Sequence, residues 1–193
     1  MNRYNPHIHH RRSIRLKGYD YSQAGLYFVT ICCQDRICRF GHIKNSQMVL
    51  NEYGRIAYNE WVQLSERFPN LELDVFQIMP NHMHGIIALG VGATLAVAQN
   101  DAVAQNEMIV GNDIRAGVSP APTKTVGDIV GAYKSLVANG CLKIYKIKNK
   151  TMGKLWQRNY HDHIIRTKKS YQRISEYIIN NPENWTDDKF HTI

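Results

Sequence analysis

The sequence lacks long apolar runs and regularly spaced cysteines. No stretch reaches the ~20 apolar residues that a membrane-spanning helix needs, and its beginning has no apolar core typical of a signal peptide. The 4 cysteines match neither a paired CxxC motif nor the disulfide pattern of a secreted domain. We therefore expect a cytoplasmic protein whose cysteines are reduced core residues.

Acidic residues are the scarcer charged type. The chain has 16 Asp and Glu against 24 Lys and Arg, which gives a formal net charge of +8. The basic excess is concentrated in residues 134–173 and in an N-terminal arm, residues 1–20. This distribution favours a polyanionic partner such as nucleic acid, and an ordinary basic surface is the alternative interpretation.

The order of the predicted elements indicates one α+β domain over residues 1–193, with an antiparallel sheet backed by helices. Alternating apolar and β-branched residues predict the strands, and an apolar period near 3.6 predicts the helices. Residues 90–124 contain the repeat AVAQND, AVAQNE and are interpreted as a flexible insertion. The expected strands are 26–34, 41–50, 71–79, 82–89 and 160–166, and the expected helices are 51–67, 125–140 and 168–180.

Two histidines begin the expected strand 82–89, directly after a short turn-forming segment. Because strand side chains alternate, His82 and His84 project from one face while Met83 anchors the other. Two imidazoles leave most of the coordination of a divalent ion open, so a third protein ligand and phosphate oxygens should complete it. Imidazole suits Mn²⁺ better than Mg²⁺. Two ordinary polar histidines near a turn are the alternative.

A second pair, His161 and His163, has the same spacing. Its middle residue, Asp162, is not expected to serve as a buried anchor, so this pair is the weaker candidate for a metal site. His163 could still contact phosphate or orient a neighbouring group.

A tyrosine on the last expected helix is a candidate nucleophile. Asn181 follows Tyr177 by four residues and shares its face if the helix continues that far. The residue before Pro182 disfavours helical backbone, which leaves Asn180 as the fallback ligand. From the residues alone, Tyr177 is more simply interpreted as an aromatic residue at the edge of the core. The same spacing to an amide occurs at Tyr19 with Gln23 and at Tyr145 with Asn149.

Three blocks of the sequence, VFQIMPNHMHGII, KLWQRNYHDHIIR and YIINNPENW, resemble the REP-associated tyrosine transposases and related single-strand insertion-sequence transposases. The resemblance covers nearly the whole chain. It implies a ferredoxin-like (RRM-like) antiparallel sheet with the HUH histidines on a central strand. It also implies that His82, His84 and Asn181 bind a divalent ion, Mg²⁺ or Mn²⁺, and that Tyr177 is the nucleophile.

The resemblance further implies an enzyme that cuts and rejoins single-stranded DNA through a 5′-phosphotyrosine intermediate. Its DNA partner would fold into hairpins such as repetitive extragenic palindromes, and the enzyme would be a monomer or a homodimer. Stacking of bases on aromatic side chains would add ~1–3 kcal/mol per base, although core packing explains Trp156 equally well. The expected DNA contacts are Arg11, Arg12, Arg15, Lys17, Lys134, Trp156, Arg158, Tyr160, His163 and Arg166.

Three other functions are compatible with parts of this pattern. A domesticated protein could bind DNA hairpins without cleaving them, but the intact His82, His84 and Tyr177 favour the enzyme. An RRM-type RNA-binding module would carry an RNP1-like aromatic run, which is absent here. A plasmid relaxase or replication initiator would share the chemistry but should lack the KLWQRNY and YIINNP blocks.

Overall fold

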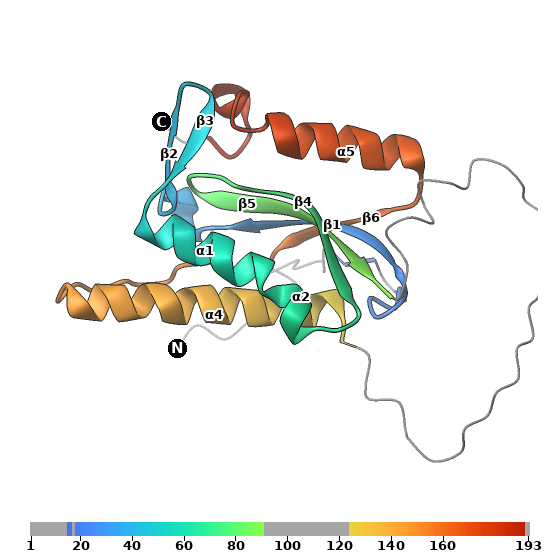
Figure 1. Cartoon of the computed structure of the whole chain (residues 1–193), viewed down its shortest axis with the longest axis horizontal. Helices are drawn as coiled ribbons and strands as arrows, with labels where there is room; N and C mark the ends of the chain where they lie inside the picture. The colour runs from blue at the N-terminus through green and yellow to red at the C-terminus, as the bar shows by residue number, and fades with distance from the viewer. Residues whose placement is uncertain (1–14, 17, 91–123, 192–193) are drawn as a thin grey trace, which may run out of the picture.

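A computed structural model describes residues 15–16, 18–90 and 124–191 of the chain (Figure 1). The expected insertion and most of the basic arm, including Arg11, Arg12 and Lys17, lie outside these residues. The elements in chain order are β1 (Gly25–Cys32), η1 (Gln34–Arg36), β2 (Gly41–Lys44), β3 (Gln47–Leu50), α1 (Glu52–Val62), α2 (Leu64–Arg67), β4 (Leu71–Ile78), β5 (His82–Leu89), α4 (Val126–Ile147), β6 (His161–Ile165), α5 (Lys168–Asn180) and η2 (Trp185–Asp187).

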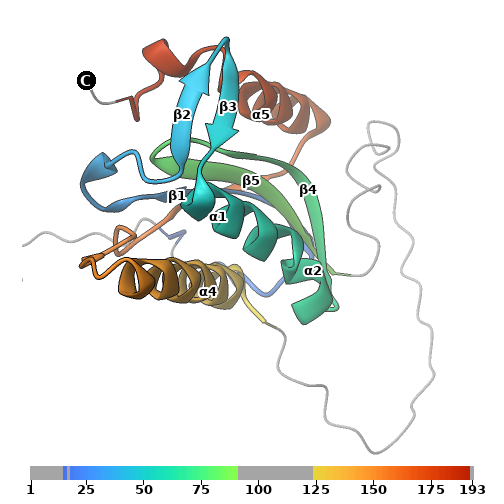
Figure 2. The same cartoon turned by 60° about the vertical axis from the view of Figure 1, so that its left-hand side comes forward.

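A four-stranded sheet in the order β4-β5-β1-β6 forms the middle layer, and its neighbouring strands are all antiparallel. Helices α1 and α4 cover one face and α5 covers the other (Figures 1 and 2). Strands β2 and β3 form a separate hairpin. The predicted α+β class with an antiparallel sheet backed by helices is confirmed, and β5, the strand that carries both histidines, is central. Among the described residues, none of the helices is both long and apolar enough to span a membrane.

The larger core lies between the sheet and the pair α1 and α4. Met83 and Ile87 of β5 are buried there against Trp61 and Tyr133. Gly85 lies between them, and a Cβ at this position would be 2.5 Å from Cζ2 of Trp61. The missing side chain therefore allows the indole to contact the strand directly, which helps to fix the register of β5.

The smaller core holds α5 against the opposite face of the sheet. Ile174 and Ile178 of α5 pack on Leu26 of β1 and on Ile86 and Ala88 of β5. Each of these strand residues alternates with a residue of the larger core, as expected when both faces of a sheet are covered. Since His82 and His84 share the alternation of Ile86, they face the same side as α5.

Two helix boundaries differ from the sequence expectation. Helix α4 runs to Ile147 and does not end near Gly140. A Cβ at Gly140 would be 2.8 Å from Cγ2 of Ile56, so this glycine permits the close approach of α1 and α4 and does not cap the helix. The expected helix 51–67 is divided at Gln63 into α1 and α2. Within β4 the pairing with β5 shifts register between Leu73 and Phe76.

Candidate active site

The two histidines of β5 are buried and face each other. Their side chains are on the α5 face, and the His82 Nε2 and His84 Nε2 atoms lie 3.0 Å apart. Burial lowers the pKa of His82 to about 4, and burial together with the neighbouring His82 lowers the pKa of His84 well below its usual value. Both rings are therefore neutral at pH 7, which is the form that binds metal ions.

Asn81 orients the ring of His82. Its amide nitrogen donates to the backbone carbonyls of Arg36 at 3.0 Å and Phe190 at 2.7 Å, so its amide oxygen faces the ring. This oxygen accepts a hydrogen bond from Nδ1 of His82 at 2.8 Å. The proton of the neutral ring is then on Nδ1, and the lone pair of Nε2 points toward His84.

Thr30 has the same role for His84. Its hydroxyl lies 2.8 Å from Nδ1 of His84 and can accept the ring proton there. Thr30 is the direct neighbour of His84 across the β1–β5 ladder, so the contact follows from the register of the sheet. Two Nε2 lone pairs at 3.0 Å repel each other unless a cation lies between them. His82 and His84 would therefore present their two Nε2 lone pairs to one divalent ion.

The last helix brings Tyr177 to this pair. Its hydroxyl lies 3.2 Å from Nε2 of His84 and donates to Asp188 Oδ2 at 3.2 Å. Burial, and then the carboxylate of Asp188, raise the pKa of the Tyr177 phenol above its usual value. The hydroxyl is therefore held in its protonated form in this arrangement.

Asn181 shares the face of Tyr177 although Pro182 follows it. Its backbone is helical, with φ −59° and ψ −39°. Its amide nitrogen donates to Asp188 at 2.7 Å, and its amide oxygen is buried without a hydrogen-bond partner among the described residues. An unsatisfied buried oxygen at this position suits a metal ligand. Asn180, the fallback, is exposed and lines the same hollow as Tyr177, Asn181 and Asp188, but it does not join their hydrogen-bond network among the described residues.

Asp188 was not predicted from the sequence. One of its carboxylate oxygens and one nitrogen of each of His82 and His84 all lie within 4.8 Å of one another. It reaches the site because the chain turns back after α5, with Trp185 buried and the Phe190 ring 4.6 Å from that of His82. Imidazole nitrogens with a carboxylate or amide oxygen form a donor set compatible with a divalent metal ion.

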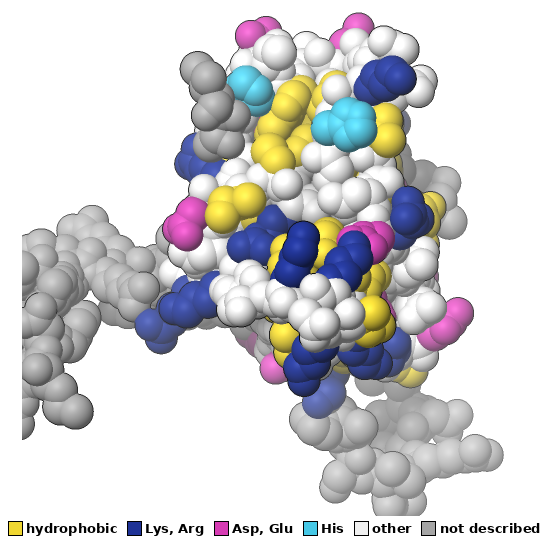
Figure 3. Space-filling model, turned by 90° about the vertical axis from the view of Figure 1, so that its left-hand side faces the viewer, with side chains coloured by type: hydrophobic (Ala, Val, Ile, Leu, Met, Phe, Trp, Pro, Cys, Tyr) yellow, Lys and Arg dark blue, Asp and Glu magenta, His cyan; other side chains and the backbone are white. Residues whose placement is uncertain are grey.

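Most of the expected DNA contacts among the described residues are spread over α4, the segment before β6, and β6 and its end. Figure 3 shows Lys and Arg side chains gathered on one face of the molecule. Arg158, His163 and Arg166 are exposed. Lys134 instead donates to the backbone carbonyls of Gln157 and Arg158, at 2.7 and 3.0 Å. Its ammonium group thus positions the segment that leads to β6.

The aromatic candidates in this region are buried. Trp156 is 8% exposed, packs on Phe40 and Tyr133, and donates to the Lys134 carbonyl at 3.0 Å, which matches the core-packing alternative. Tyr160 is 5% exposed and its ring is stacked under Arg15.

The expectation for Asp162 was wrong, since its side chain is only 2% exposed. It forms an ion pair with Arg15 at 3.4 Å, so it anchors β6 on the α4 side of the sheet. A charged residue can take this buried position because Arg15 neutralises it. His161 and His163 consequently project from the opposite face, the face of His82 and His84.

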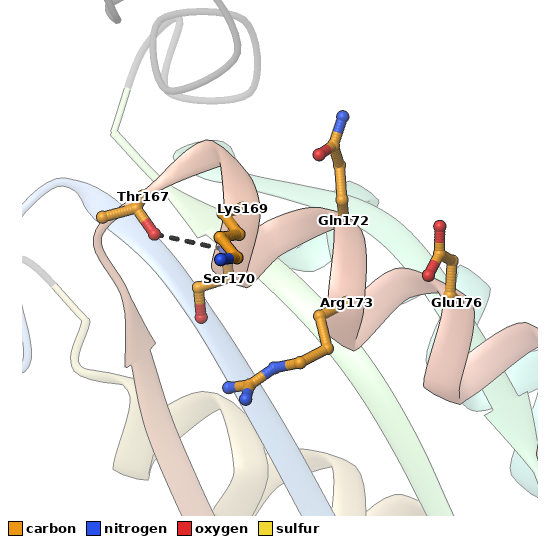
Figure 4. A pocket seen from close by; sticks show the side chains of 6 residues that line it. All are labelled: Thr167, Lys169, Ser170, Gln172, Arg173 and Glu176. Atoms are coloured by element: carbon orange, nitrogen blue, oxygen red, sulfur yellow. Dashed lines mark hydrogen bonds between the residues drawn. The ribbon is translucent and has the colours of Figure 1, made fainter.

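Two polar hollows run along α5. One is lined by Tyr177, Asn181 and Asp188 together with Arg173 and Glu176. Figure 4 shows the other, which shares the last two residues; here Arg173 extends away from Gln172 and Glu176. The exposed side of α5 is therefore polar up to the tyrosine.

Comparisons with known proteins identify a relative in sequence and solved structures with a similar fold. No model of a protein family matches the sequence. The chain is 41% identical over 191 residues to a Haemophilus influenzae protein described as uncharacterized, and the match covers 98% of this chain and 97% of the other. This chain belongs to that protein's family.

Among solved structures, the fold is similar to that of a REP-associated tyrosine transposase bound to a REP hairpin. The TM-score is 0.54 at 16% identity, over 91% of this chain and 76% of the transposase chain. At this identity the likeness establishes the fold alone. A Deinococcus radiodurans protein, with a TM-score of 0.42 at 16% identity over 86% of this chain and 95% of its own, is too distant to support an argument.

Proposed function

We propose that the protein is a metal-dependent, single-tyrosine strand transferase that cuts and rejoins single-stranded DNA containing hairpins. The observation that carries the proposal is the approach of the Tyr177 hydroxyl to within 3.2 Å of His84 Nε2, beside the converging nitrogen of His82. The sequence blocks that resemble tyrosine transposases include all three of these residues. The fold likeness to a transposase solved with a REP hairpin supports the choice of DNA.

In this reaction the Tyr177 oxygen forms a bond to the phosphorus of a phosphodiester, and the bond from phosphorus to the 3′ oxygen breaks. The products are a 5′-phosphotyrosine and a free 3′-hydroxyl. Asp188 accepts the hydrogen bond of the phenol and is placed to receive its proton, while the departing oxygen takes a proton from solvent. Attack by a 3′-hydroxyl on the phosphotyrosine later reverses the step.

His82, His84 and either Asp188 or Asn181 would hold the ion, Mg²⁺ or Mn²⁺. When bound, the ion supplies positive charge that stabilises the charge developing on the phosphate oxygens. The chain's own contribution is orientation, because Asn81 and Thr30 fix the two rings before any ligand arrives.

The proposal is tested by incubating the protein with Mn²⁺ or Mg²⁺ and single-stranded DNA that carries the hairpins flanking its own gene. We expect a covalent protein–DNA adduct on a denaturing gel. The adduct should disappear in Tyr177→Phe and persist in Tyr145→Phe and Tyr171→Phe, two tyrosines whose hydroxyls contact Arg39 and Asp74 away from the site. Hairpin binding without an adduct under either ion would make a non-cleaving hairpin-binding protein the better account.

A further inference from the structure

A groove beside the site is not used by the chemistry described above. It lies on the α5 face of the sheet, over β1 and the edge strand β6. We call it the β6 groove, and it is lined by Phe28, Thr30, Arg36, His161, Asp162, His163, Lys189 and Phe190. Thr30 contacts His84 and Phe190 contacts His82, so the groove is directly adjacent to the site.

The floor of the groove is aromatic. The half-buried Phe28 ring is stacked on His84, with centroids 5.4 Å apart, and meets Tyr177 edge-on at 6.3 Å. A planar group resting on Phe28 would therefore lie next to the candidate nucleophile. A nucleic acid base is such a group, and stacking on aromatic side chains is the main way in which single strands are held without sequence preference.

The outer wall of the groove carries two histidines. His163 pairs directly with Phe28 across the β1–β6 ladder, and His161 pairs with Thr30. Directly paired residues have their side chains on the same face of the sheet. Both histidines are exposed. Their spacing of two residues along one edge strand offers two hydrogen-bonding groups in a row beside the floor.

The charge of the groove is positive. Arg36 and Lys189 lie at the end nearest to His82, since both cations lie over the ring of Phe190, which is 4.6 Å from the ring of His82. The guanidinium of Arg36 also donates to the backbone carbonyl of Lys189 at 2.8 Å, and the two cationic groups lie 5.4 and 4.9 Å from the centroid of the Phe190 ring. The acidic residue of β6, Asp162, is paired with Arg15 on the other side of the sheet. Asp162 is one of the lining residues, but its carboxylate is only 2% exposed and is neutralised by Arg15, so the exposed charges of the groove are those of Arg36 and Lys189.

We propose that the β6 groove binds the stretch of single-stranded DNA that adjoins the phosphate attacked by Tyr177. Its bases rest on Phe28, and its phosphates contact His161, His163 and Lys189. This assignment rests on the proposed function, since it places the strand relative to the same phosphate. Single-stranded DNA is favoured over a duplex because the aromatic floor requires an unpaired base.

The test measures binding of a fluorescein-labelled oligothymidylate by fluorescence anisotropy in EDTA, so that neither metal nor cleavage contributes. We expect the double variant His161→Ala, His163→Ala to bind about tenfold more weakly than the unmodified protein. Lys189→Ala should also weaken binding and reduce the salt dependence of log K by about 0.7. His42→Ala and Lys44→Ala, exposed residues on the β2–β3 hairpin, are the matched controls and should bind normally.

Unchanged binding by the double variant, with thermal unfolding equal to that of the unmodified protein, would overturn the assignment. Equal weakening for a blunt duplex would overturn the choice of single strands. The two proposals can fail separately. A Tyr177 adduct with no effect of the groove variants would refute the groove alone, whereas a groove effect without any adduct would refute strand transfer and keep the binding site.

Discussion

The carboxylate of Asp188 accepts hydrogen bonds from both Tyr177 and Asn181 on a single oxygen, Oδ2, at 3.2 and 2.7 Å. Its other oxygen accepts from the backbone nitrogen of Phe190 at 2.6 Å. One acidic side chain thus joins the candidate nucleophile, the candidate amide ligand and the segment after η2. Binding measurements can separate its proposed role as a metal ligand from this structural role.

Replacing Asp188 should weaken metal binding. We expect Asp188→Ala to bind Mn²⁺ about tenfold less tightly or worse in isothermal titration calorimetry, because one of the converging oxygen donors is lost. Asp187→Ala, which removes an exposed carboxylate one residue earlier, is the matched control and should bind normally. Normal affinity in Asp188→Ala with a loss in Asn181→Ala would make Asn181 the third ligand, as the sequence predicted.

Metal affinity should depend on the hydroxyl group of Thr30 more than on the volume of its side chain. Thr30→Val keeps the volume but removes the partner of His84 Nδ1, so we expect Mn²⁺ affinity to fall by roughly tenfold. Thr30→Ser keeps the hydroxyl, and the ring of His84 keeps its partner, so this variant should retain most of the affinity of the unmodified protein. Both affinities are measured by isothermal titration calorimetry. Equal affinities of the two variants would show that Thr30 does not orient the ring.

The metal-free protein should lose stability in mild acid. The pKa of His82 is about 4 in the folded protein against an ordinary value of 6.5, and that of His84 is also lowered. The unfolded chain therefore binds more protons, so stability is fully present above pH 6.5 and falls as the pH decreases toward 4. Thermal unfolding across this range in EDTA measures the effect. His82→Gln should flatten the curve, and an identical slope in that variant would contradict the explanation.

A side chain at Gly85 should be costly. Because its Cβ would lie 2.5 Å from the Trp61 ring, we expect Gly85→Ala to lower the free energy of unfolding by about 1–3 kcal/mol in urea. Gly131→Ala is the control, since nothing lies within 4 Å of a Cβ there. In the interior of α4 it should raise the free energy of unfolding by about 0.5–1 kcal/mol. Equal changes in the free energy of unfolding of the two variants would show that the Trp61 ring can shift at little energetic cost.

Local patterns accounted for much of the fold and for part of the site. The alternation after the turn at Asn81 placed His82 and His84 on one face, and the apolar period of 168–180 matched α5. The order of strands and helices predicted the layered α+β class. These features depend on neighbours in sequence, which is why one sequence sufficed.

The remaining features depend on contacts between distant residues. Asp188 joins the site only because the chain folds back after α5, and no spacing in the sequence signals that turn. Asp162 is buried because Arg15 reaches it from the start of the described chain. The sequence predicts the end of a helix at Gly140, but in the structure Gly140 lies within the helix and packs against Ile56. Such pairings follow from tertiary packing, which overrides local preference.

The side chain of Asn81 links the ring of His82 to two backbone carbonyls, one before the second strand of the chain and one near its end. The orientation of the ring and the seating of Phe190 are therefore coupled thermodynamically. A ligand that binds better to one orientation of the ring also stabilises the packed position of Phe190. By the same coupling free energy, displacing Phe190 lowers the affinity for that ligand. Hydrogen exchange of the Phe190 amide should accordingly slow down when a ligand binds at His82 and His84.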